Sequence, residues 1–445
     1  MRTDRELAAS LLQKAVDLGA EQAEAYIRRS RMLGAEAREG QFHALDNSVS
    51  LAYGVRVIRE GRLGFSYSTE TADADDVIER ALSTMAFSGQ DEFLALPMPE
   101  GGYPEAACHD PEVMGVAPER AVEYAKLVES AAYASDPRVK KTRKSSLSLS
   151  ESHIFIANTH GLSAGYSSTF ASAGITVVAE EGGDSQTGWG YDGGRFLCDI
   201  DMSRAGREAA ERACSLLGAQ RAATGKVDLI IDRAVAVDIL SAAAAMLSAE
   251  NVQKGKSLLE GRVGQRVISR KLNIVDDPLR PGSQALKPMD GEGVPARANT
   301  LVSEGVLIGF MHNTYTANKD RTRSTANAVR SGASSLPGVG PQGLILEASD
   351  DPVSMDTLIG SISRGVLVTD AMGVHTINPV SGAFSIGISG ISIERGALGL
   401  PVREAVISGN ILDFLGSVEA ACDDLRYMGS MGSPSLLVTG VDLSA

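Results

Sequence analysis

Histidine spacing is the first test of whether this chain can hold a catalytic zinc ion. Zinc hydrolysis needs two or three imidazole or carboxylate ligands, and a further carboxylate that takes a proton from the zinc-bound water. No two histidines lie three to five residues apart, the spacing that lets one helix direct two imidazoles at one ion. The six histidines are His43, His109, His153, His160, His312 and His375. We therefore predict no metal site from local sequence, and only ligands from distant segments could assemble one.

Two carboxylates occur together in the glycine-rich segment Asp290-Gly291-Glu292-Gly293-Val294-Pro295. Such a turn can bind a cation, a substrate amine or a basic side chain of a partner, but its acids can equally cap the N–H groups of the turn. Asn313 and Asn327 are each followed by small residues and could bond an extended peptide or satisfy their own loops. We therefore take Asp290, Glu292, Asn313 and Asn327 as candidate substrate or partner contacts, with both interpretations open.

Two other motifs match catalytic or cofactor patterns only by spacing. Gly161–Gly165 has the Gly-x-Ser-x-Gly form of a serine-hydrolase nucleophile elbow, with Ser163 at its centre, but a strand-like run follows where the elbow requires a helix. Gly338–Gly343 has the Gly-x-Gly-x-x-Gly spacing of a dinucleotide fingerprint, but Pro341 and a strand-like run replace the required helix. The sequence predicts a β-turn at the first motif and a loop at the second.

The composition is that of an ordinary globular protein with an acidic surface. The chain has 445 residues, 43% of them hydrophobic and 22% charged, and its formal net charge is −14. This charge opposes binding to a phosphate backbone, so direct nucleic-acid binding is not expected. The one basic run, Arg138–Lys144, has five cations in seven residues and is typical of a solvated face or linker.

The cysteines and the start of the sequence indicate a reducing, cytoplasmic setting. Cys108, Cys198, Cys214 and Cys422 are widely spread and include no Cys-x-x-Cys pair, so neither a disulfide framework nor a zinc knuckle is expected. The first residues lead directly into a charged amphipathic helix, unlike a secretory signal. The longest apolar run, Ala234–Leu247, is too short to span a bilayer, so we expect no membrane partner.

The periodicity of apolar residues predicts an α+β fold. Alternation over Val49–Val57 and Leu63–Tyr67 predicts a β-hairpin, and residues 145–200 are expected to form a small antiparallel sheet. A strand at Val227–Ile231 is followed by an alanine-rich helix, Arg233–Ser248. Short apolar runs broken by glycine and proline then predict a β-rich C-terminal sandwich or barrel-like domain.

A chain of this length is expected to contain more than one domain. A proline-rich stretch gives the clearest boundary, because its prolines lie among glycines and acidic residues and read as an extended connector. The expected parts are an N-terminal α+β domain at 1–88, a connector at 89–116, a central α+β segment at 117–225 and the β-rich C-terminal domain at 226–445.

The order of several separated motifs resembles the TldD/PmbA (TldD/TldE) family over nearly the whole chain. The matching segments are Ala44–Ser48, Gly54–Val57, Lys254-Gly255-Lys256-Ser257, the acidic turn at 290–295 and Asn313-Thr314-Tyr315-Thr316. In the metal-bearing branch of that family, a helix carries His-Glu-x-x-x-His shortly before a Lys-Gly-x-Ser turn. An ungapped count back from Lys254 places those ligands at Leu240, Ser241 and Ala245, none of which can bind zinc or activate zinc-bound water. The C-terminal loop that supplies a cysteine ligand in that branch corresponds to 423–434, which contains no cysteine.

The resemblance is therefore to the metal-free branch, and it implies a non-catalytic subunit of a heterodimeric TldD–TldE-type metalloprotease. In that family the two kinds of chain pair around a cavity and cleave small or unfolded peptides in the cytoplasm. Zinc is then expected in the metal-bearing partner, with no cofactor in this chain. The family's older label, modulator of DNA gyrase, implies the alternative of a protein-binding regulator without a peptidase role. A third possibility, an autonomous hydrolase using Ser163 or the Asp290/Glu292 pair, lacks the supporting context.

Overall fold

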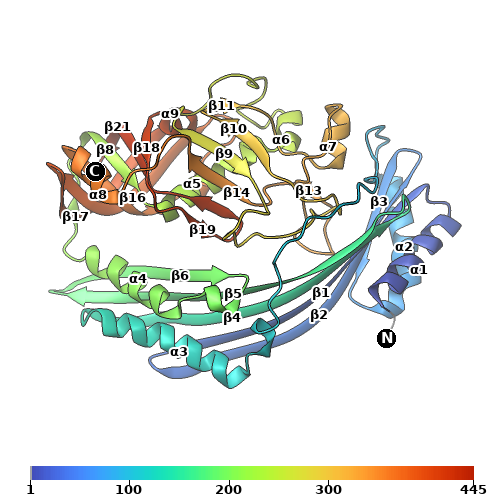
Figure 1. The fold of residues 1–445 in the computed structure, drawn as a ribbon, viewed down its shortest axis with the longest axis horizontal. Helices are drawn as coiled ribbons and strands as arrows, with labels where there is room; N and C mark the ends of the chain where they lie inside the picture. Colours follow the sequence, from blue (N-terminus) through green and yellow to red (C-terminus); the bar gives the residue numbers. More distant parts are fainter. Residues whose placement is uncertain (1–2) are drawn as a thin grey trace.

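A long curved antiparallel sheet forms the N-terminal half of the computed structural model, which describes residues 3–445 (Figure 1). Its strand order is β3-β2-β1-β4-β5-β6. The bounds are β1 (Gln22–Arg38), β2 (Gln41–Arg59), β3 (Arg62–Ser68), β4 (Val139–Asn158), β5 (Ser163–Glu181) and β6 (Asp184–Gly194). The predicted hairpin is confirmed as β2 and β3. The sheet predicted within 145–200 is larger than expected, because β4 pairs with β1 and so joins strands from both sides of the connector.

Four helices cover one face of this sheet. They are α1 (Asp4–Asp17), α2 (Ala74–Thr84), α3 (Pro118–Ser135) and α4 (Met202–Ser215). Alternate residues of β1, such as Ala25, Ile27 and Ala35, are buried on the helix-covered face. Because successive strand residues point to opposite faces, Glu24, Tyr26 and Arg28 lie on the other face, which meets the C-terminal domain.

A closed five-stranded barrel forms the centre of the C-terminal half, which confirms the predicted α+β class with a barrel-like domain. Its strands are β8 (Gly225–Ile231), β15 (Arg364–Met372), β16 (Ala383–Glu394), β17 (Ala397–Asn410) and β21 (Leu436–Ser444). The ring closes where β21 pairs with β17. The short strands β7 (Gln220–Arg221) and β18 (Val418–Ala421) extend it.

A second sheet, of order β11-β10-β9-β14-β20-β19, lies beside the barrel. Its strands are β9 (Leu272–Asp276), β10 (Asn299–Ser303), β11 (Val306–Leu307), β14 (Leu344–Ala348), β19 (Arg426–Met428) and β20 (Met431–Ser433). The remaining elements are β12 (Ala328–Val329), β13 (Gly338–Val339), α5 (Arg233–Ala244), α6 (Ala249–Gln253), α7 (Thr314–Lys319), α8 (Met355–Ser361) and α9 (Ile411–Gly416). The largest apolar core packs α5 against the barrel and this sheet.

The segment 89–116 has little regular structure and contacts both halves of the molecule. One 3-10 turn, Val113–Gly115, interrupts it. The Tyr103 hydroxyl donates to the carbonyl of Gly293 at 2.9 Å, and the Tyr315 hydroxyl donates to Asp91 at 2.7 Å. Figure 1 shows this segment crossing from the end near α2 to the start of α3. The division of the chain into four parts remains a prediction, since one sheet spans the first and third.

The basic run Arg138–Lys144 lies at the start of strand β4, and acidic residues lie beside much of it. Arg138 pairs with Asp136 and Glu181, Lys141 with Glu180, and Lys144 with Glu36. These carboxylates reduce the positive charge that a phosphate backbone would meet. All four cysteines are free, and no helix among residues 3–445 combines the length and apolarity needed to cross a bilayer.

Candidate functional site

Helix α5 presents a small polar face to a cavity of about 560 Å³. The helix begins where Asp232 accepts a hydrogen bond from the backbone N–H of Ala234 at 2.9 Å, as an N-cap residue does. Its apolar side lies in the core, and the side facing the cavity carries small side chains and one carboxylate. The helix residues that line the cavity are Asp238, Ser241, Ala242 and Ala245, and the segment 371–379, including His375, forms the opposite wall.

The three positions that correspond to the zinc-binding motif of the metal-bearing branch do not all face this cavity. Ser241 and Ala245 line the cavity, but Leu240 is only 1% exposed and packs in the core. Each helical residue advances by about 100°, so Leu240 points away from the side that Asp238 and Ser241 occupy. Leu240 therefore does not contribute to the cavity wall. Asp238, the one charged residue within Ala234–Leu247, was the sequence signal for the exposed face.

Asp290 caps the acidic turn. One carboxylate oxygen accepts the backbone N–H groups of Glu292 and Val294, each at 2.9 Å, and the other accepts that of Ala328 at 3.0 Å. Burial, followed by the charge of Glu292, raises the pKa of the Asp290 carboxyl above its ordinary value. Of the two interpretations drawn from the sequence, turn capping is the one seen in this geometry, although Asp290 also lines a second cavity.

Glu292 belongs to a buried chain of alternating charges between the two halves of the molecule. Arg56 on β2 donates to Glu292 at 3.0 Å and to Glu24 on β1 at 2.7 Å. Glu24 also pairs with Arg330 of the C-terminal domain. Glu24 is 1% exposed and Glu292 is 0% exposed. Because these four residues neutralise one another, the interface is held by two arginines and two carboxylates without a net charge.

Asn313 and Asn327 are also occupied within the chain. The Asn313 side chain caps α7 by accepting the N–H of Thr316 at 2.9 Å. The Asn327 amide donates to Asp276 at 2.6 Å and to the carbonyl of Gly340 at 3.0 Å. Both side chains are buried. In this arrangement they satisfy their own loops, and their contact with a substrate or partner stays a prediction that needs these loops to rearrange.

Neither of the two motifs that matched only by spacing forms the structure that its chemistry requires, although a short strand replaces part of the loop predicted at 338–343. Ser163 is the first residue of strand β5, after the turn that follows β4, so no strand-to-helix elbow forms around it. Gly338 and Val339 form the short strand β13, and strand β14 follows without an intervening helix. Neither site therefore has the helix N-terminus that its chemistry requires.

Three family models match successive parts of the chain. They are described as PmbA/TldA metallopeptidase domain 1, matching 23–84, the central domain, matching 115–217, and the C-terminal domain, matching 224–445. Together they cover most of the chain in the family's order. The chain belongs to the PmbA/TldD family.

Similar proteins extend over nearly the full length of this family member. A protein named metalloprotease PmbA from Escherichia coli O157:H7 is 25% identical over 427 residues, which span 94% of this chain and 90% of that relative. A Thermotoga maritima structure, described as a proposed modulator of a DNA gyrase, has a TM-score of 0.91 at 26% identity and covers 99% of this chain and 100% of its own. The structure of TldE from Thermococcus kodakarensis has a TM-score of 0.90 at 23% identity, with 99% and 100% covered, and shows the same fold.

The PmbA/TldD family is described as a metallopeptidase family, so the residues around α5 can be tested for a fit to zinc. The cavity wall offers Asp238 and His375 as its ionisable residues, and alanine or serine at the other helix positions. Among residues 3–445, no three His, Cys, Asp or Glu side chains lie close enough together to hold a metal ion. Since catalytic zinc sites use three protein ligands and an activating carboxylate, this residue set does not fit such a site.

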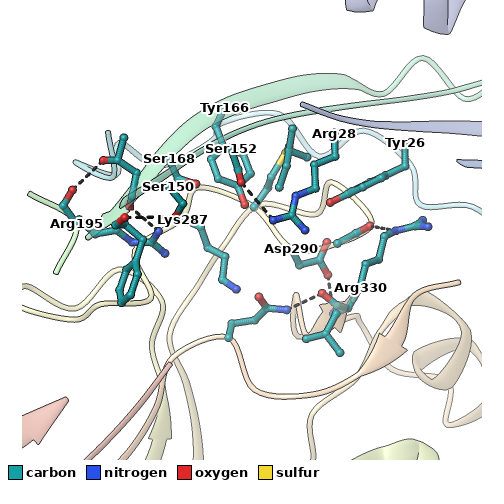
Figure 2. A pocket seen from close by; sticks show the side chains of 18 residues that line it. Tyr26, Arg28, Ser150, Ser152, Tyr166, Ser168, Arg195, Lys287, Asp290 and Arg330 are labelled. Atoms are coloured by element: carbon teal, nitrogen blue, oxygen red, sulfur yellow. Dashed lines mark hydrogen bonds between the residues drawn. The ribbon is translucent and has the colours of Figure 1, made fainter. Parts of the chain in front are cut away.

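A second cavity, of about 310 Å³, lies between the N-terminal sheet and the C-terminal domain of this family member (Figure 2). Tyr26 and Arg28 reach it from β1, and Lys287 and Asp290 come from the segment between β9 and β10. In Figure 2, Lys287 lies between Arg195 on one side and Asp290 on the other. Among the ionisable residues of this cavity, only Asp290 was a candidate from the sequence, because the others come from segments that are distant along the chain.

Lys287 provides a pH-dependent test of this cavity. Burial lowers the pKa of its ammonium group to about 8 from 10.5. Below about pH 8 the folded state carries a buried charge, whereas between about pH 8 and 10.5 the unfolded state binds more protons, so this contribution to stability rises with pH. We expect Lys287→Met to be about 1–3 kcal/mol more stable than the parent protein at pH 7, and this difference to shrink towards pH 10.5.

Urea unfolding from pH 7 to 10.5 measures the difference, with Lys226→Met, at an exposed position, as the matched control. The control should track the parent protein at every pH. A Lys287→Met protein that is less stable than the parent at pH 7 would show that a nearby group already stabilises the charge.

Proposed function

We propose that this chain is the non-catalytic subunit of a two-chain, TldD–TldE-type metalloprotease that cleaves small or unfolded peptides in the cytoplasm. The observation that carries the proposal is the α5 cavity, whose helix wall offers Asp238, Ser241, Ala242 and Ala245 in place of a zinc ligand set. The family membership supplies the reaction class, and zinc is assigned to the metal-bearing partner. In this chain the cavity wall helps to shape the chamber in which the partner acts.

An unpaired strand edge supports association with another chain. Strand β3 pairs with β2 only over Tyr53–Arg59, so among residues 3–445 the stretch from Gln41 to Ala52 has β1 as its only strand partner. Phe42 is 56% exposed and Val49 is 75% exposed on this stretch. A long exposed edge with apolar side chains favours pairing with another strand, and natural proteins usually cover or charge such edges.

Peptide cleavage by this chain, by its metal-bearing partner and by their mixture is the test. We expect no cleavage by this chain alone and chelator-sensitive cleavage by the mixture, because only the partner would provide the zinc-bound water. A mixture in which the partner's zinc ligands are replaced should be inactive. Robust chelator-sensitive cleavage by this chain alone would overturn the proposal.

The strand edge can be tested in the same mixtures. Val49→Lys places a charge on the exposed edge and should reduce co-elution with the partner in gel filtration, together with cleavage by the mixture. Phe87→Ser is the matched control, because Phe87 is 92% exposed and lies away from this edge. Equal losses in both variants would argue against the edge as the contact surface.

A further inference from the structure

The cavity between the two halves of the chain has an excess of positive charge. Its wall contains four cationic side chains and, among its lining residues, one carboxylate, that of Asp290. The cations are Arg28, Arg195, Lys287 and Arg330. Both carboxylate oxygens of Asp290 accept hydrogen bonds from backbone N–H groups, in its own turn and at Ala328. Asp290 therefore has little capacity left to pair with the cations of the cavity wall.

Three of these cations have no carboxylate within ion-pair distance among the described residues, whereas Arg330 pairs with Glu24. Arg28 donates to the hydroxyls of Ser30 at 3.1 Å and Ser152 at 3.3 Å. Arg195 donates one bond, to the carbonyl of Thr169 at 2.9 Å, and its buried Nε has no acceptor within residues 3–445.

Lys287 completes the set from the opposite side of the cavity. Its ammonium group has no hydrogen-bond acceptor in the part of the chain that the structure describes, although it reaches the cavity that Arg28 and Arg195 line. Keeping charged groups partly out of bulk water without an ion-pair partner is unfavourable. The three half-buried cations gathered around one cavity therefore favour an anionic occupant.

We propose that this cavity binds a small molecule with two negatively charged oxyanion groups through Arg28, Arg195 and Lys287. Guanidinium groups match the paired oxygens of carboxylates and phosphates, and the hydroxyls of Ser152 and Ser168 can add further donors. A volume of about 310 Å³ accommodates a compact ligand and no folded partner. The residues that carry this proposal all belong to this chain, so binding can be measured on the chain alone.

Calorimetric titration of the full chain tests the site directly. The probes are succinate, inorganic phosphate and succinamide, the neutral analogue of succinate, at low ionic strength to limit screening. We expect at least one anion to bind with a Kd below about 1 mM and succinamide to give no binding heat. Preferential binding of succinate assigns a carboxylate ligand, and preferential binding of phosphate assigns a phosphorylated one.

Variants decide whether the three cations are responsible. Lys287→Met and Arg195→Gln should each weaken binding at least about tenfold, which corresponds to loss of a charge-assisted contact. Lys226→Met and Arg31→Gln, at exposed positions outside the cavity wall, should bind as the parent protein does. Thermal unfolding of each variant checks folding, and Lys287→Met is expected to fold at least as stably as the parent. Absence of binding by both anions at about 10 mM, or unchanged affinity in both cavity variants, would overturn the proposal.

Discussion

Replacing Arg56 with methionine is expected to lower the free energy of unfolding by about 3–5 kcal/mol, the effect of breaking a buried ion pair from one side. Arg56 donates to Glu24 and Glu292, both of which are buried. Methionine preserves much of the side-chain volume but leaves these carboxylates with less positive charge, and only Arg330 remains beside Glu24. Urea unfolding followed by far-UV circular dichroism measures the change.

Arg59→Met is the matched control, because Arg59 lies on the same strand and is exposed. It should change the free energy of unfolding by no more than about 0.5 kcal/mol. A similarly small effect at Arg56 would show that the buried charges are hydrated or compensated by other groups. In that case the alternating charges would not hold the two halves of the chain together.

Gly190→Ala is expected to have the second large effect, at or above the upper end of the roughly 1–3 kcal/mol typical of overpacking. Helix α4 packs so closely on β6 that a methyl group at Gly190 would overlap the backbone carbonyl oxygen of Ala205. The helix face in contact is built of small residues, so only backbone movement can relieve the overlap. Trp189, the only tryptophan in the sequence, is adjacent and stacks on Arg212, so its fluorescence reports this contact locally.

Gly174→Ala is the control within the same sheet. A methyl group there would lie 3.8 Å from the Ser146 hydroxyl, an ordinary van der Waals distance. This variant should keep the parent fluorescence and stability within about 0.5 kcal/mol. Equal stability of the Gly190 and Gly174 variants would mean that α4 can shift away from the sheet without loss.

Strong apolar periodicity made the hairpin, the α5 helix and the β-rich C-terminal half predictable. Strand β1 was missed for a physical reason. Its buried positions include Ala23, Ala25, Ala35 and Ala37, and alanine is depleted in strands and favours helices. The strand is fixed by its pairing with β2 and β4, and β4 lies far along the chain, so local sequence carried little of the signal.

The candidate site was only partly accessible from the sequence for the same reason. Glu292 was recognised as an unusual carboxylate, but its partner Arg56 is 236 residues away. When that partner is unknown, the sequence does not distinguish a ligand contact from a structural ion pair, because both use a carboxylate. The second cavity was missed because Arg28, Arg195 and Lys287 form no motif along the chain and meet only when the sheet and the C-terminal domain come together.

The alternating charges between the two halves also set an order for folding during synthesis. Glu24 and Arg56 face each other across β1 and β2, so they can pair as soon as that hairpin forms. Glu292 and Arg330 emerge from the ribosome much later and join a pair that is already neutral. Chains fold from the N-terminus as they are made. We therefore expect the curved sheet to form before the C-terminal half is synthesised, without leaving an isolated buried charge.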